Sequence, residues 1–266
     1  MRLTVIGCSG SFPGPDSPAS CYLVEAEGFR LLIDLGSGGL SGLQRRIRLD
    51  QIDAICISHL HSDHCIDLCG LSVARMIHPR GPMPPLPVYG PERTQLRLGR
   101  ALAADPVPDA RPPGPGNESD SRFTGAFSFV TITPGTTQIG PLRVTTALMN
   151  HPVQTFGFRV EHAGRSLAYS ADTGQTEALV DLARGADILL CEASFLEPAA
   201  GAPALPEGLH LTARQAAQHA ARAGAGHLVL THLVPWNDTS AALDEASRDF
   251  RGPVSLAFSE RELTLE

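Results

Sequence analysis

Three features are scarce in this sequence of 266 residues: excess positive charge, paired cysteines and long apolar runs. The net charge of −7 argues against a general nucleic-acid binder, because affinity for a polyanion depends on cationic side chains that neutralise phosphates. The six cysteines form no Cys-x-x-Cys pair, so we expect buried thiols and a reducing, cytoplasmic setting. No apolar run approaches the length of a membrane span, and no signal peptide is expected before Cys8.

Aromatic residues are also few, at 5%, whereas 26 glycines and 22 prolines predict many turns. With 42% hydrophobic and 18% charged residues, the composition is that of an ordinary globular protein. A chain of this length can bury a full core, and we expect a single domain over residues 1–266. Residues 105–120 are rich in proline and charge, which predicts a mobile surface loop inside that domain.

The most informative stretch is residues 59–64, in which three imidazoles and a carboxylate follow an apolar, strand-like run. His59 and His61 are two residues apart and should project to one side of the strand end. Asp63 and His64 follow on the next turn and can reach a different point. One short stretch can therefore begin two metal sites.

Three further ligand-type residues follow predicted strands later in the chain. His151 comes after the apolar run 142–148, Asp172 after 166–170 and His232 after 227–231. Alone, each has an ordinary structural explanation, since strand-end histidines and Asp-Thr-Gly turns are common. Their shared position after strands, together with the first motif, argues against coincidence.

The predicted elements fall into two halves, each a run of strands followed by strand–helix units. Candidate ligands follow strands in both halves. This pattern predicts an α/β fold, a four-layered αββα sandwich in which two mixed sheets pack face to face with helices outside. The site is expected along the edge that the two sheets share.

In these motifs and their order, nearly the whole chain resembles the metallo-β-lactamase superfamily of dinuclear hydrolases. Imidazole and carboxylate ligands suit two Zn²⁺ ions, with Mn²⁺ or Fe²⁺ as substitutes, and two such cations can activate water and clamp a phosphate or carbonyl oxygen. The resemblance implies one metal held by His59, His61 and His151, a second held by Asp63, His64 and His232, and Asp172 as the bridge between them.

Asp34 matches the superfamily's early acidic position and is expected to orient a histidine of the motif; a turn-forming role before a glycine is the alternative. Glu192, in Cys-Glu-Ala-Ser, and His210, at a helix start, resemble the phosphodiesterase branch that includes ribonuclease Z, although that branch has His and Thr in place of Cys191 and Ser194.

In that branch the histidine acts on the phosphate or the leaving oxygen, and the glutamate holds it. A buried glutamate favours a protonated imidazole, which can donate a proton to a leaving alkoxide. The expected catalytic residues are His210, Glu192 and the metal ligand Asp63. A surface histidine that caps the helix is the alternative for His210.

The chain has no identifiable counterpart of the long basic arm of ribonuclease Z enzymes. It also resembles compact actinobacterial-type members described as cyclic-nucleotide phosphodiesterases, in segments 7–11, 14–20, 65–68 and 235–236. This resemblance implies a small phosphodiester as the substrate, above all a 3′,5′-cyclic nucleotide such as cAMP. Neither long nucleic acid nor a membrane is expected as a partner, and a homodimer follows only by analogy.

Three other functions stay open: a ribonuclease Z-like endonuclease acting on the 3′ end of transfer RNA, a lactone or thioester hydrolase, and a metal-binding regulatory protein without turnover. The loop of residues 8–20 could form one wall of the pocket or only a turn. Trp236 and Phe156 are the candidates for stacking on a base, with a place in the core or at the rim as the alternative.

Overall fold

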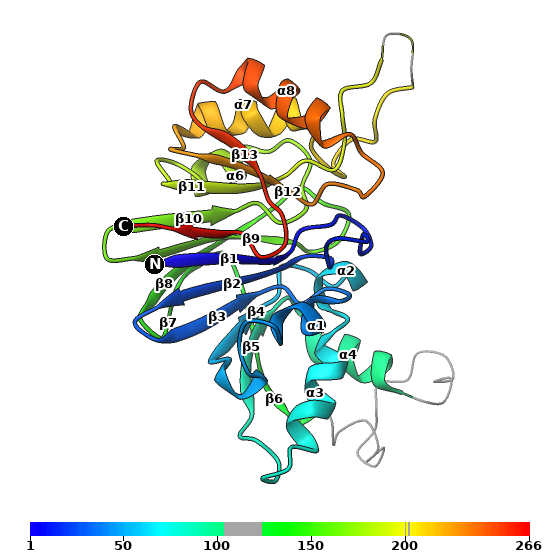
Figure 1. The fold of residues 1–266 in the computed structure, drawn as a ribbon, viewed down its shortest axis with the longest axis vertical. Coiled ribbons are helices and arrows are strands. Elements are labelled where there is room, and N and C mark those ends of the chain that lie inside the picture. The colour runs from blue at the N-terminus through cyan, green and yellow to red at the C-terminus, as the bar shows by residue number, and fades with distance from the viewer. Residues whose placement is uncertain (104–123, 200, 202) are drawn as a thin grey trace.

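The computed structural model describes residues 1–103, 124–199, 201 and 203–266, so the loop predicted at 105–120 lies outside the described residues. Within them, two seven-stranded sheets pack face to face and carry helices on their outer faces (Figure 1). The N-terminal half forms most of one sheet and its helices, and the C-terminal half forms the other (Figure 1). The predicted four-layered fold is confirmed.

The first sheet is mixed and comes mainly from the N-terminal half. Its strands, in spatial order, are β14 (Glu262–Thr264), β1 (Arg2–Gly7), β2 (Cys21–Ala26), β3 (Phe29–Ile33), β4 (Ala54–Cys56), β5 (Leu86–Gly90) and β6 (Phe127–Thr131). The strands from β14 to β3 are antiparallel, and β3 to β6 run parallel. Because β14 pairs with β1, the two chain ends lie close together (Figure 1).

The second sheet has the same mixed construction. Its strands, in spatial order, are β13 (Val254–Leu256), β12 (Leu228–Thr231), β11 (Ile188–Glu192), β10 (Arg165–Tyr169), β9 (Phe156–His162), β8 (Leu142–Leu148) and β7 (Gly135–Ile139). The strands from β7 to β10 are antiparallel, and β10 to β13 are parallel. The carboxyl ends of β10, β11 and β12 therefore meet at one edge, where ligands bind in open α/β sheets.

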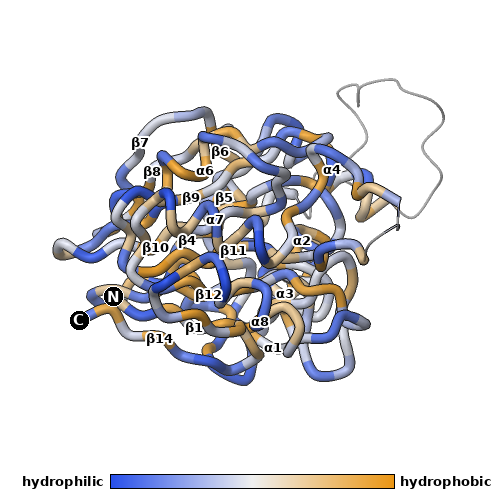
Figure 2. Tube along the Cα trace, turned by 90° about the horizontal axis from the view of Figure 1, so that it is seen from above, coloured by the Kyte–Doolittle hydropathy of each residue, from blue (hydrophilic) through white to orange (hydrophobic). Residues whose placement is uncertain are grey.

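The helices form the two outer layers (Figure 1). Those on the first sheet are α1 (Gly39–Leu43), the 3₁₀ helix η1 (Leu49–Gln51), α2 (Ser62–Cys65), α3 (Leu68–Met76) and α4 (Thr94–Leu102). Those on the second are α6 (Glu177–Leu182), α7 (Ala213–Ala223) and α8 (Thr239–Asp249). Hydrophobic stretches run through the strands, and hydrophilic ones gather in the peripheral loops (Figure 2). None of the described helices is long and apolar enough to cross a bilayer.

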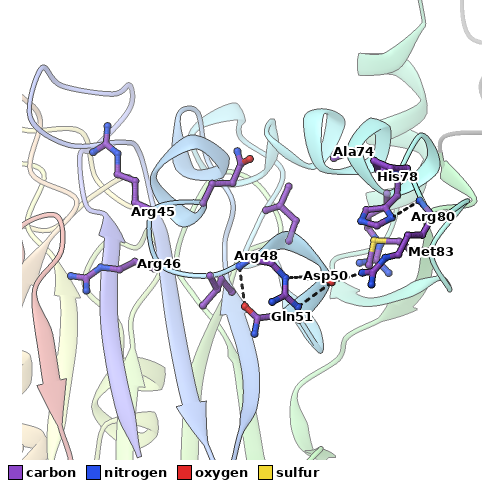
Figure 3. A pocket seen from close by; sticks show the side chains of 14 residues that line it. Arg45, Arg46, Arg48, Asp50, Gln51, Ala74, His78, Arg80 and Met83 are labelled. Carbon is purple, nitrogen blue, oxygen red and sulfur yellow. Dashed lines mark hydrogen bonds and ion pairs between the residues drawn. The ribbon is translucent and has the colours of Figure 1, made fainter.

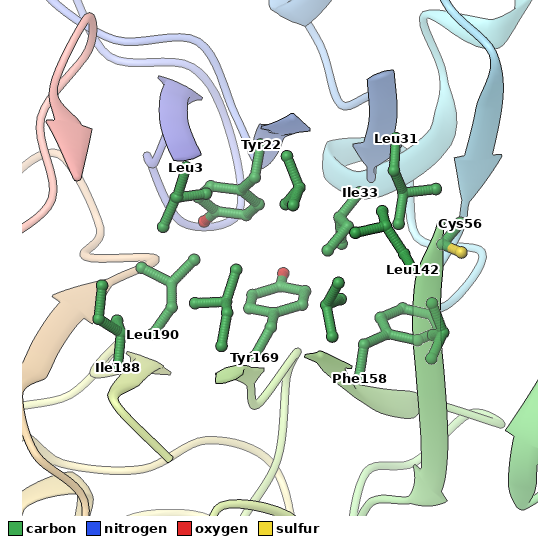
Figure 4. Packing of buried hydrophobic residues seen from close by; sticks show 14 of the residues in the cluster. Leu3, Tyr22, Leu31, Ile33, Cys56, Leu142, Phe158, Tyr169, Ile188 and Leu190 are labelled. Atoms are coloured by element: carbon green, nitrogen blue, oxygen red, sulfur yellow. The ribbon is translucent and has the colours of Figure 1, made fainter. Parts of the chain in front are cut away.

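The central core lies between the two sheets, where apolar side chains from each sheet face one another (Figure 4). Leu3 and Ile33 of the first sheet oppose Leu190 and Phe158 of the second, and all four side chains are buried. Each such side chain removed from water contributes about 1.5–3 kcal/mol. Tight packing here fixes the position of one sheet relative to the other, and hence of the strand ends that carry the candidate ligands.

A specific side-chain contact defines the start of α7, where Thr212 caps the helix and Gln215 returns the contact. The strand before the first histidine motif is short, because only Ala54–Cys56 pairs in the sheet. The terminal strand Glu262–Thr264 was not predicted. All six cysteines are free thiols, five of them buried.

Candidate metal centre

The first histidine motif leaves β4 and turns at once into the short helix α2. His61 has an extended backbone and sits at the N-cap position of α2. His59 and His61 therefore lie in the extended segment between β4 and α2, whereas Asp63 and His64 lie in the helix. This change of direction, rather than alternation along a strand, separates the two pairs. As expected, this one stretch contributes to two separate His/Asp clusters.

The first cluster joins three histidines and one aspartate. Nε2 of His59 lies 3.1 Å from Nδ1 of His61, and Nε2 of His151 lies 3.4 Å from the same Nδ1. The Oδ2 atom of Asp172 is 3.6 Å from Nε2 of His59. His61 is exposed and His151 half-buried, so this side of the centre faces solvent.

The second cluster is buried throughout and uses the other oxygen of Asp172. Nε2 of His64 lies 3.2 Å from Nε2 of His232 and 3.2 Å from Oδ1 of Asp172. Oδ2 of Asp63 is 3.2 Å from Nε2 of His232. Because its two carboxylate oxygens face different clusters, Asp172 is placed to join them.

The outer nitrogen of each buried imidazole has a hydrogen-bond partner. Nδ1 of His64 lies 2.8 Å from Oδ2 of Asp34, and Nδ1 of His232 lies 2.8 Å from Oγ of Ser194. His151 directs Nδ1 to the Leu209 carbonyl oxygen at 2.8 Å. An imidazole that donates from Nδ1 carries a lone pair on Nε2, which therefore points into the cluster. The contact expected between Asp34 and a motif histidine is present.

The residues fit a pair of cations. Nε2 of His64 lies 3.2 Å from Oδ1 of Asp172, an oxygen that is buried and has no hydrogen-bond partner among the described residues. Burial would lower the pKa of His64, but the charges of Asp172 and Asp34 outweigh burial and hold that pKa well above its usual value. The imidazole is therefore a cation between two carboxylates, in a position that suits a divalent ion once the ion displaces the Nε2 proton. Burial holds the pKa of His59 well below its usual value, which favours the neutral ligand form.

Asp172 titrates in the complementary direction. Burial alone would raise the pKa of this carboxyl group, but the surrounding imidazoles outweigh burial and hold the pKa well below its usual value. An ionised carboxylate at the junction is the form that ligates a divalent metal, and metal binding releases the protons that the imidazoles carry. These buried His/Asp clusters are therefore suited to a dinuclear metal site.

Glu192 and His210 lie beside both clusters. Oε1 of Glu192 is 3.1 Å from Nδ1 of His210, and that nitrogen is 4.0 Å from Oδ2 of Asp172. Glu192 is fully buried and also accepts from the Thr173 backbone N–H at 2.5 Å and from the Ser194 hydroxyl at 2.8 Å. Burial would lower the pKa of His210, but the Glu192 charge and hydrogen bond outweigh it and raise the pKa to about 8.

Three residues at the site hold left-handed backbone conformations. Asp34, Ala171 and His232 have φ values of 58°, 51° and 56°, and each follows the end of a strand, β3, β10 or β12. A non-glycine residue in this region costs roughly 1–3 kcal/mol. These conformations turn the chain sharply at the sheet edge. They thereby position the candidate ligands Asp172 and His232, and Asp34, which orients His64.

The loop of residues 8–20 forms a wall of the site. The backbone N–H of Ser11 lies 3.5 Å from Nε2 of His232. Gly10 permits this approach, because a Cβ atom there would lie 2.3 Å from the His232 carbonyl oxygen. Phe12, next in the loop, packs on Trp236 with ring centroids 5.0 Å apart.

The two candidates for base stacking fare differently. Trp236 is 76% exposed and lies four residues beyond His232, at the rim of the centre. Phe156 is fully buried in the core between the sheets, so it is not available to a ligand and the alternative, a place in the core, is the one observed. Phe12 was missed, because nothing in its local sequence indicates that it packs on Trp236.

Comparison with known proteins now gives the class. The family model described as "Beta-lactamase superfamily domain" matches residues 30–233. An uncharacterized protein of Mycobacterium tuberculosis is 42% identical over 256 residues, covering 96% of this chain and 88% of that protein. A ribonuclease Z of Mycolicibacterium gilvum is 30% identical over 258 residues, covering 88% and 85%.

The probable metallo-hydrolase YhfI of Bacillus subtilis is 28% identical over 266 residues, covering 97% of this chain and 98% of that protein. Its crystal structure, described as a metallo-beta-lactamase fold protein, matches with a TM-score of 0.81 at 27% identity over 99% of both chains. The chain belongs to the beta-lactamase superfamily. With its two His/Asp clusters, it is a probable metal-dependent hydrolase of that superfamily.

Proposed function

We propose that this chain is a dinuclear-metal phosphodiesterase that hydrolyses a small phosphodiester, with a 3′,5′-cyclic nucleotide as its preferred substrate. The observation that carries the proposal is the Glu192–His210 pair, in which Glu192 holds Nδ1 of the imidazole 4.0 Å from the carboxylate that joins the two clusters and leaves Nε2 as the proton donor. A thioester hydrolase expels a thiolate, which is a better leaving group than a ribose alkoxide, and therefore has less need of such a donor.

In this proposal each of the two His/Asp clusters holds one metal ion. When bound, the two cations activate water and stabilise the negative charge that develops on phosphorus-bound oxygens. The nitrogen and oxygen donors favour Zn²⁺, with Mn²⁺ or Fe²⁺ as substitutes. The holding residues are His59, His61 and His151 for one ion, Asp63, His64 and His232 for the other, and Asp172 for both.

His210 would act as the general acid. Its Nδ1 is engaged with Glu192, which leaves Nε2 as the atom available to a substrate. With a pKa of about 8, the imidazole is protonated at neutral pH and can donate from Nε2 as the phosphorus–oxygen bond breaks, so that the leaving alkoxide departs as a hydroxyl group. The Ser11 backbone N–H, beside His232, is placed to donate to a phosphate oxygen.

The aromatic pair at the rim supports a nucleotide substrate. Phe12 and Trp236 are both exposed, and they come from the two loops that border His232. Stacking on aromatic side chains contributes about 1–3 kcal/mol per base and tolerates different bases. A cyclic nucleotide would place its phosphate at the cations and its base on this pair.

A transfer-RNA endonuclease is the second candidate, because the ribonuclease Z of Mycolicibacterium gilvum is 30% identical to this chain. The net charge of −7 weighs against it, since long RNA is held through many phosphate contacts. The two functions separate on substrate size. A small-molecule phosphodiesterase has weak, salt-insensitive contact with transfer RNA, whereas an endonuclease binds it with an affinity that falls steeply as salt rises.

The test is a substrate panel on protein of measured metal content: cyclic mononucleotides, bis(p-nitrophenyl) phosphate, a lactone and a transfer-RNA precursor. We expect turnover of the cyclic nucleotides, which Asp63→Ala or His64→Ala abolishes together with metal content. His210→Ala should lower kcat by about 10²–10⁴ with metal retained. His162→Ala, at a histidine on β9 outside the centre, is the matched control. Unchanged turnover in metal-replete His210→Ala, or activity on the lactone alone, would overturn the proposal.

A further inference from the structure

A second cavity, of about 710 Å³, opens in the helical layer of the first sheet. We call it the arginine groove (Figure 3). It lies among η1, the last turn of α3 and the loop that follows. The charged residues that line it are Arg45, Arg46, Arg48, Asp50, Arg75 and Arg80.

The arginine groove is separate from the metal centre. Helix α3 begins at Leu68, just after the motif helix α2, and meets the groove only at its far end, at Ala74 and Arg75. A nine-residue helix is about 14 Å long at 1.5 Å per residue. None of the residues of the two His/Asp clusters lines the groove.

Positive charge dominates the lining, with five arginines against one carboxylate. That carboxylate, Asp50, is shared: Arg48 Nε lies 2.9 Å from its Oδ1 and Arg80 Nη2 lies 3.0 Å from its Oδ2 (Figure 3). Arg46 is neutralised from outside the groove by Glu260 and Glu262. The remaining arginines, Arg45 and Arg75, have no carboxylate partner among the described residues.

Arg75 is the most informative member. It is only 4% exposed, and one amino group donates to the Pro84 carbonyl oxygen. Its Nε and Nη1 atoms are buried and have no hydrogen-bond partner in the described part of the chain. A buried charge without a partner is costly, and burial lowers the pKa of this guanidinium accordingly. An anion in the groove, in contact with the lining or through a water at its floor, would compensate the charge.

We propose that the arginine groove is a second ligand site, which binds the dianionic group of a phosphate monoester. Guanidinium groups match phosphate geometry, and a dianion compensates two of the three positive charges left after Asp50 and the glutamates beside Arg46 are counted. The cavity volume is within the range of pockets that hold small molecules, so an attached nucleoside or sugar fits as well as free phosphate. A concave site with one buried cation suits a small ligand better than an extended polyanion.

The test is calorimetric titration of the metal-loaded protein, with inorganic phosphate in one arm and a 5′-mononucleotide in the other. Because the metal centre also attracts phosphate, we expect two binding events in the wild type, one of which depends on the groove. Arg75→Met should weaken that event about ten- to hundredfold, the loss expected for a charge-assisted hydrogen bond, and leave the other unchanged. A lower Kd for the groove-dependent event with inorganic phosphate identifies free phosphate as the ligand. A lower Kd with the 5′-mononucleotide identifies a nucleotide.

Two further variants guard against misfolding. Arg48→Gln and Arg80→Gln alter side chains that are 73% and 76% exposed, and each should weaken the same event. Arg184→Gln, at an exposed arginine paired with Asp181, is the charge-matched control and should change neither event. Superimposable isotherms for the wild type and Arg75→Met, in both arms and with metal content equal, would overturn the proposal. Calorimetry measures binding and does not depend on turnover. Its result is therefore independent of the test of phosphodiesterase activity.

Discussion

Replacing Asp34 with asparagine keeps the size of the side chain and removes its charge. The carboxylate is fully buried, and its Oδ2 atom faces three donors: the Ser58 hydroxyl at 2.8 Å, Nδ1 of His64 at 2.8 Å and the Tyr169 hydroxyl at 2.9 Å. Its Oδ1 atom accepts from the Ser58 backbone N–H at 2.7 Å. An asparagine whose oxygen stays with that N–H turns its NH₂ group toward the three donors.

The consequence falls on His64. Facing an NH₂ group, its Nδ1 can only accept, so the proton moves to Nε2, the atom that faces Asp172 and His232. A protonated Nε2 cannot ligate a metal. Losing such an orienting contact typically costs 10–100-fold in metal affinity. The Ser58 hydroxyl keeps His59 Nδ1 as a partner at 3.1 Å, whereas the buried Tyr169 hydroxyl loses its acceptor. That loss adds about 1–3 kcal/mol of destabilisation, against a typical stability of about 5–15 kcal/mol.

The assay is zinc competition against a chromophoric chelator, with urea unfolding of the metal-free protein run in parallel. Tyr169→Phe is the control, because it removes one donor to the same oxygen and leaves the carboxylate and the His64 tautomer intact. We expect Asp34→Asn to lose at least tenfold in affinity at one of two sites and Tyr169→Phe to stay near the wild type. Equal metal affinity in Asp34→Asn and the wild type would refute the role assigned to Asp34.

The remaining predictions concern the acid, the rim and a turn. If His210 is the acid, kcat falls as pH rises through the pKa of His210, which is about 8 without metal and lower beside two cations. The pH profile of His210→Ala should therefore lack this fall in kcat at alkaline pH. A fall that persists in the variant argues against the role. Trp236→Ala should raise KM for a cyclic nucleotide about tenfold or more at little change in kcat, from the loss of stacking. Ala163, at φ 49°, precedes Gly164 in the turn between β9 and β10, where an Asn-Gly pair is favoured. Ala163→Asn should therefore raise the free energy of unfolding, measured in urea, by about 0.5–1 kcal/mol. Ala163→Val should lower it.

The fold and the clustered ligands could be predicted because their signals are local. Alternating or apolar runs mark strands, and His59, His151 and His232 each follow one, at the edge that the two sheets share. The positions of these side chains depend on topology, which the order of elements largely determines. The order of elements therefore made the αββα sandwich accessible from sequence, whereas the grouping of the seven candidate ligands came from the resemblance to the superfamily.

The parts that escaped prediction depend on contacts between distant segments. Tyr169 reaches Asp34 across 135 positions, and Phe12 meets Trp236 across more than 200. Neither residue stands in a motif of its own. Ser194, which holds the Nδ1 atom of His232, had a faint signal as the last residue of the Cys-Glu-Ala-Ser segment. The arginine groove combines α3 with a segment 23 or more residues earlier, and isolated arginines there are typical of ordinary surface charge.

Two hydrogen bonds between the sheets explain how half-sites from opposite sheets stay in register. Tyr169 of β10 donates to Asp34, which follows β3, and Tyr22 of β2 pairs with Thr231 of β12 at 2.7 Å. Thr231 directly precedes His232, and Tyr169 is three residues before Asp172. A slip of one sheet over the other would leave these polar groups unpaired in the core, at about 1–3 kcal/mol each. Apolar packing alone tolerates small sliding, so the tyrosine pair supplies the specificity that a site assembled from both sheets requires.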